Sequence, residues 1–123
     1  MSPLIQQSIE AWQVNNRINL MILDELSAEA LASTLSTRGG RTVAVQFAHM
    51  HNVRLQWLEV SVPAIYKTQT KLNTEGNLDA ALLKKTLTAS ANAVAEWMGT
   101  ADDGGKLKGY KKGVIFLLSY ICA

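Results

Sequence analysis

The sequence predicts an all-α protein, and three observations support this prediction. Apolar residues recur at alternating spacings of three and four, Ala and Leu dominate those segments, and β-branched residues never gather into alternating runs. Only two prolines occur, so little interrupts long helices. Because most predicted loops are short, we expect an antiparallel four-helix bundle without a β-sheet, with helices over residues 3–26, 42–60, 78–98 and 112–123.

The first predicted helix begins with a recognisable N-terminal signal. Ser2 can cap the helix with its hydroxyl, and Pro3 fits the first turn, where its missing N–H is not needed. Two asparagines, Asn16 and Asn19, interrupt the apolar stripe near its middle, and Ser27 is expected to cap a short helical continuation. We expect the stripe to face the other helices; it comprises Ile5, Ile9, Trp12, Asn16, Asn19, Leu23 and Leu26.

The second predicted helix, over 42–60, follows a candidate N-cap at Thr42 and stops before Pro63. Apolar residues populate so much of its circumference that we expect the helix to be largely buried. The linker over 61–77 that follows is long enough to cross the bundle. It should contain one helical turn around Ala64–Thr68.

The third predicted helix begins at Asn77 or Leu78 and ends before Gly99. The fourth is an uninterrupted apolar run for which the chain offers no partner strand, so helix is favoured over strand. This run contains no glycine, basic last turn or proline that would end a helix, and we expect the fourth helix to be incomplete at Ala123. An incomplete helix leaves apolar surface on its neighbours, which predicts a homodimer.

Length and composition indicate one globular domain, residues 1–123, and argue against several classes of protein. The net charge of +2 is small and no strong basic face is evident, so we expect no nucleic-acid partner. No window reaches the roughly 18 apolar residues of a membrane span, and no secretory signal is evident. Cys122 is the single cysteine, so we expect an inert core thiol and a soluble, cytoplasmic protein.

Two histidines, His49 and His51, are candidate metal ligands, but they are about 200° apart around a helix and cannot bind one ion together. At most one of them faces the interior. His49 shares a flank with Val45 and Val53, so we expect its imidazole to point into the bundle near Asn16 or Asn19. His51 should lie on a different side of the helix. The usual alternative for a lone histidine is a hydrogen-bonded core residue.

The segment over 47–58, FAHMHNVRLQWL, resembles the DinB superfamily of bacterial four-helix proteins, also called DinB/YfiT-like. Members of that superfamily typically have an Asn on the first helix, then a loop, then a second helix with an apolar-Ala-His segment and an aromatic residue eight positions later. In this chain the matching residues are Asn16, Gly39-Gly40, His49 and Trp57. The resemblance extends over essentially the whole chain.

This resemblance implies a divalent metal ion, zinc or nickel, held by three histidines. It implies His49 as the first ligand, and a His-x-x-x-His pair on the last helix as the other two, which would follow Ala123. Characterised relatives include transferases and isomerases that use low-molecular-weight thiols, and homodimers are common. The implied function is therefore a metal-dependent transferase or hydrolase of small molecules.

Two questions stay open at this point. Asn16 and Asn19 either orient a metal ligand or substrate, or specify the register of the helices, as buried asparagines can. The alternative function is a non-catalytic helical dimer used in interaction or in a stress response. The metal, the substrate and the thiol cannot be identified from the sequence.

Overall fold

The computed structural model describes residues 2–34 and 39–122. Within these residues the elements are all helices, and β-structure is limited to two isolated bridges, so the all-α prediction is confirmed. No helix in the described part of the chain is long and apolar enough to cross a membrane. The helices are α1 (Pro3–Glu25), α2 (Ala28–Leu31), α3 (Val43–Ser61), α4 (Pro63–Tyr66), α5 (Ala80–Gly99) and α6 (Val114–Ile121).

Side-chain caps start most of the helices, as the sequence predicts. Ser2, Ser27 and Thr42 each accept a hydrogen bond from the backbone N–H three residues later, at 3.3, 3.0 and 3.1 Å. Helix α5 begins two residues after the predicted start, because Asp79 caps it and accepts a hydrogen bond from Leu82 N–H at 2.8 Å. The predicted helical turn after α3 corresponds to α4, and α6 likewise starts two residues later than predicted.

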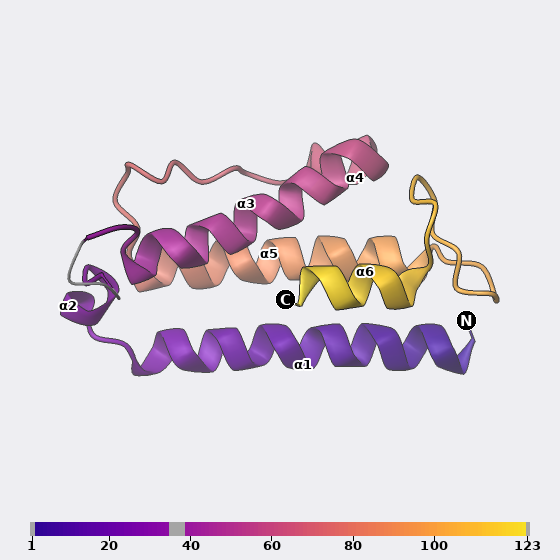
Figure 1. The fold of residues 1–123 in the computed structure, drawn as a ribbon, viewed down its shortest axis with the longest axis horizontal. Helices are drawn as coiled ribbons and strands as arrows, with labels where there is room; N and C mark the ends of the chain where they lie inside the picture. The colour runs from indigo at the N-terminus through magenta and orange to yellow at the C-terminus, as the bar shows by residue number, and fades with distance from the viewer. Residues whose placement is uncertain (1, 35–38, 123) are drawn as a thin grey trace.

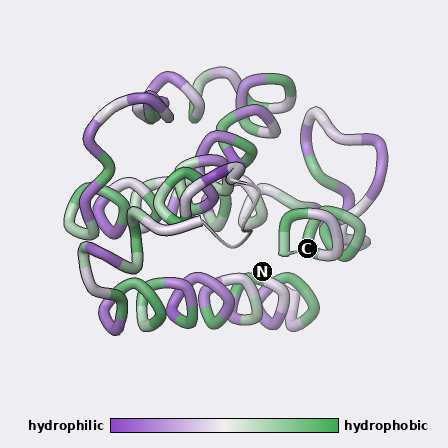
Figure 2. The backbone as a smooth tube through the Cα atoms, turned by 60° about the vertical axis from the view of Figure 1, so that its left-hand side comes forward, coloured by the Kyte–Doolittle hydropathy of each residue, from purple (hydrophilic) through white to green (hydrophobic). Residues whose placement is uncertain are grey.

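Helix α5 is the centre of the arrangement, since it packs against both α1 and α3 (Figure 1). The shorter α6 lies beside the part of α1 nearest the N-terminus and ends near the middle of α1 (Figure 1). Hydrophobic residues follow one another along most of α6 (Figure 2). Its Val114 and Leu117 are buried in a core cluster with Trp12 and Trp97. The second half of α1 contributes to a separate core cluster through Leu23.

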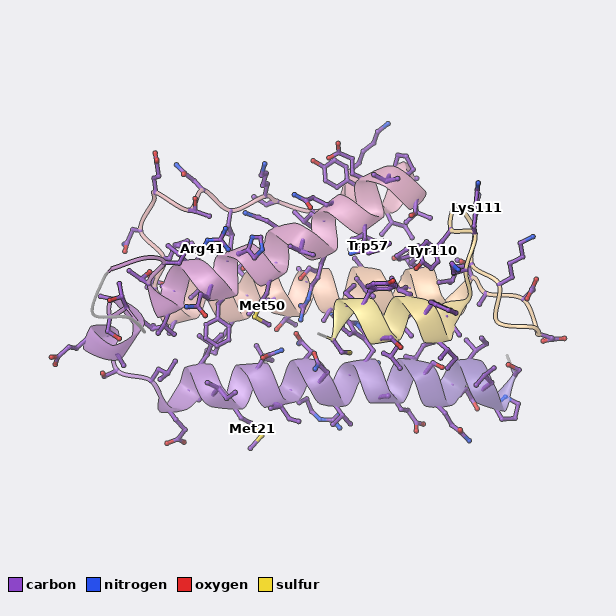
Figure 3. All side chains as sticks on the ribbon, viewed as in Figure 1. Met21, Arg41, Met50, Trp57, Tyr110 and Lys111 are labelled. Atoms are coloured by element: carbon purple, nitrogen blue, oxygen red, sulfur yellow. The ribbon has the colours of Figure 1, made fainter. Side chains whose placement is uncertain are left out.

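Tryptophan side chains fix the loop between α5 and α6. The Trp97 indole N–H donates a hydrogen bond to the Lys108 carbonyl at 3.0 Å. The Tyr110 ring meets Trp57 of α3 edge-on, with 5.4 Å between ring centroids, and Figure 3 shows these two residues at the same end of the molecule. The loop therefore packs against the end of α3, and these contacts set the position at which α6 begins.

The linker between α4 and α5 runs back along α3 and is attached to it by two side chains (Figure 1). His51 bonds to the Thr70 carbonyl at 2.7 Å, and Asn52 bonds to the Leu72 backbone. Both residues are buried. The linker thus covers one side of α3, and this covering decides which residues of α3 are inside.

Candidate ligand-binding site

A cavity of about 470 Å³ lies where α1, α3 and the end of α6 meet. This volume is within the range of small-molecule sites in proteins. Figure 3 shows Met50 on the side of α3 that faces α1. The lining combines polar and apolar side chains: Asn15, Asn19, His49, Met50, Val53, Arg54, Tyr120, Ile121 and Cys122.

His49 lines this cavity but is exposed, so the prediction that its imidazole points into the bundle is wrong. The inward position on α3 belongs to His51, which is 1% exposed. The two histidines do lie on different sides of the helix, as predicted, and His49 does share the cavity with Asn19. The error arose because α3 is apolar over most of its circumference, so the hydrophobic pattern could not show which flank α5 and the linker cover.

His51 has a structural environment rather than a ligand-binding one. Its Nε2 lies 2.7 Å from the Thr70 carbonyl oxygen, which can only accept, so Nε2 carries the proton and donates. Its Nδ1 is buried without a hydrogen-bond partner among the described residues. Burial lowers the pKa of His51 most; the bond to Thr70 opposes this effect and the positive charge of Arg54 adds to it. A neutral imidazole therefore ties α3 to the linker.

The two candidate asparagines of α1 occupy different positions. Asn19 is partly buried and lines the cavity, where its amide nitrogen donates a hydrogen bond to Asn15 Oδ1 at 3.4 Å. Asn16 is 6% exposed and does not line the cavity, and its Oδ1 has no hydrogen-bond partner in the described part of the chain. The structure therefore brings Asn19, and not Asn16, together with His49.

Arg54 is a site residue that the sequence did not predict. It lines the cavity but is only 2% exposed, and its Nη1 donates hydrogen bonds to the Leu87 carbonyl at 2.9 Å and to Ser90 Oγ at 3.1 Å. Its guanidinium carbon lies 4.6 Å from the centre of the Trp12 ring. Burial lowers the pKa of Arg54 to about 10. The feature of the sequence that could have identified Arg54 is its position as a charged residue in the middle of an apolar flank of α3.

Cys122 lies in the cavity wall and is exposed, so the prediction that this cysteine lies in the core is wrong. Desolvation of the thiol raises its pKa, and the positive charge of Arg54 opposes that rise. The side chain therefore remains a protonated thiol near neutral pH. It is accessible to a reagent or ligand that enters the cavity.

The described residues do not by themselves complete a tight metal site. No group of three His, Cys, Asp or Glu residues in this part of the chain could hold a metal ion. The cavity provides one imidazole, from His49, and one thiol, from Cys122, that keeps its proton. Any further ligands implied by the resemblance would have to come from outside the described residues.

The cavity brings together residues from α1, α3 and α6 that are far apart in the sequence, as is usual for binding sites in folded proteins.

The likeness to the DinB superfamily depends on the motif residues of this chain. Comparison of the chain with protein-family models, with curated proteins and with solved structures finds no match in any of the three.

Proposed function

We propose that the chain is a DinB-like antiparallel four-helix bundle that acts in the cytoplasm as a metal-dependent transferase or hydrolase of small molecules. Transfer that uses a low-molecular-weight thiol as co-substrate is one reaction within this class. The observation that supports this proposal is the cavity shared by α1, α3 and α6. It is large enough for a small molecule, and it combines an accessible imidazole with amide and apolar groups.

His49 is the metal ligand in this proposal. Its side chain makes no hydrogen bond within the described residues, and it faces the cavity. His51 is unsuited to this role because its protonated Nε2 is bonded to Thr70 and its other nitrogen is enclosed. Zinc or nickel would supply Lewis-acid chemistry once its further ligands are present, and Asn19 is placed to orient a ligand beside it.

A residue-resolved metal titration tests this assignment. The imidazole resonances of the chain are followed by NMR while Zn²⁺ or Ni²⁺ is added. We expect weak binding that perturbs His49 and spares His51, and that disappears in His49→Ala. The matched control is His51→Gln, whose amide nitrogen can replace Nε2, and it should bind metal like the wild type. Metal binding that survives the loss of His49 would contradict the proposal.

A specific observation favours the alternative, a non-catalytic helical dimer with an interaction or stress-response role. Four large apolar residues of α1 are exposed at helical spacing, and together they form an outward stripe that we call the α1 stripe: Val14, Ile18, Met21 and Ile22. Figure 3 shows Met21 pointing away from the other helices. A second copy of the chain is the partner that this hypothesis requires. A dimer that binds neither metal nor small molecules would favour this alternative.

A further inference from the structure

Arg54 is a buried cation, and no Asp or Glu is buried among the residues that the structure describes. The Arg54 side chain is 2% exposed. The ion pair found among the described residues joins Lys84 to Asp24; both side chains are exposed, and neither residue is near Arg54 in the sequence. Burying a charge without a counter-charge is costly, and two neutral hydrogen bonds and a contact with Trp12 offset only part of that cost. A buried charge that lines a cavity is a candidate functional group.

The surroundings of Arg54 fit a negatively charged ligand. Among the described residues no Asp or Glu lines the cavity, so none of them neutralises the field of the guanidinium there. Nη1 is already bonded to α5, whereas Nε and Nη2 donate no hydrogen bond within the described residues. A planar guanidinium with free donors matches the two oxygens of a carboxylate. The Asn19 amide and the His49 imidazole are further hydrogen-bond donors in the lining of the same cavity.

We propose that the cavity binds a small organic anion through its carboxylate, with Arg54 as the buried counter-charge and the apolar lining against the body of the ligand. Met50, Val53 and Ile121 supply that apolar surface. This inference adds a substrate class to the proposed function. It rests on the proposed function only because it treats the bound ligand as a substrate. Recognition of the carboxylate by Arg54 needs no metal ion.

The test compares benzoate with its neutral isostere benzamide by calorimetric titration, with a chelator present to remove metal. We expect benzoate to bind the wild-type chain about tenfold more tightly than benzamide, because a hydrogen bond to a charged group is worth roughly a factor of ten or more. Arg54→Met should remove this preference while preserving the packing on Trp12. Arg54→Lys should retain part of it. The matched control, Arg17→Met, removes one exposed arginine of α1 and should leave the preference unchanged.

Equal affinity for benzoate and benzamide, or no binding of either, would overturn the proposal. It would also be overturned if inorganic phosphate bound more tightly than benzoate, or if Arg17→Met removed the preference as fully as Arg54→Met. If Arg54→Met does not fold, the wild-type preference decides the outcome, together with NMR shifts of Ile121 and Cys122 on addition of benzoate. Failure of the metal titration would leave this result unaffected, so the two proposals can fail separately.

Discussion

Asn52 and Leu72 exchange two hydrogen bonds: the Asn52 amide donates to the Leu72 carbonyl at 2.9 Å, and the Leu72 N–H donates to Asn52 Oδ1 at 2.9 Å. Both residues are buried, so no water replaces these bonds easily. The pair fixes the linker against α3 across 20 positions of sequence. It therefore helps to decide which side of α3 is covered.

The first prediction is that Asn52→Ala lowers the free energy of unfolding by about 2–4 kcal/mol, because it leaves two buried backbone groups of Leu72 unpaired. Urea denaturation measures the loss, and amide hydrogen exchange should become faster at Leu72. Asn92→Ala, at an exposed position of α5, is the control and should change stability little. A similar loss in both variants would mean that the pair does not hold the linker.

The second prediction concerns pH and His51. Its pKa is lowered from the ordinary value of 6.5 in the folded chain, so the unfolded chain binds more protons in the interval between the two values. The contribution of His51 to the free energy of unfolding should therefore be fully present above the pKa of the unfolded chain. It should decrease as the pH falls through 6.5 towards the pKa of the folded chain. Urea midpoints at about pH 7.5 and about pH 5.5 measure this decrease.

The variant His51→Gln should lose most of that pH dependence, because glutamine can still donate to the Thr70 carbonyl but does not titrate. His49→Gln is the control, since His49 is exposed and contacts solvent. It should retain the wild-type dependence. An unchanged pH dependence in His51→Gln would show that another group is responsible.

The third prediction concerns Gly109, which lies in the loop between α5 and α6 with φ +73°. A Cβ at this position would collide with the backbone carbonyl of Ser61, at the end of α3. Gly109→Ala should therefore cost about 2–4 kcal/mol from backbone strain and overpacking. Chemical denaturation followed by the fluorescence of Trp97, whose indole bonds to the same loop, measures the effect. Gly104→Ala should cost much less, because Gly104 has an ordinary φ.

The fourth prediction is a dimer that forms through the α1 stripe. Exposed apolar residues at helical spacing associate with a partner surface, and a charge placed among them should weaken that association. Light scattering at tens of micromolar should give the mass of a dimer for the wild type and of a monomer for Met21→Lys. Gln13→Lys, an exposed polar position of α1 beside the stripe, should remain dimeric. A monomeric wild type would refute the prediction.

Much of the fold could be predicted from the sequence, because the responsible interactions are local. A capping hydroxyl and the N–H that it satisfies are three residues apart, so Ser2, Ser27 and Thr42 could be identified without any tertiary information. The candidate site was predicted only in part. Asn19 was expected to be near His49, and both line the cavity, whereas Arg54 and Cys122 were not expected there.

The sequence by itself determined the helical class, the caps at Ser2, Ser27 and Thr42 and the approximate bounds of the long helices, since these depend on contacts within one or two turns. Only the tertiary structure decided that His51 is buried while His49 is exposed, and that Arg54 reaches the cavity wall. The reason is that α3 is apolar on several flanks, so its own pattern allows more than one orientation. The packing of α5 and of the linker against α3, over distances of 20 to 36 residues in sequence, selects one of them.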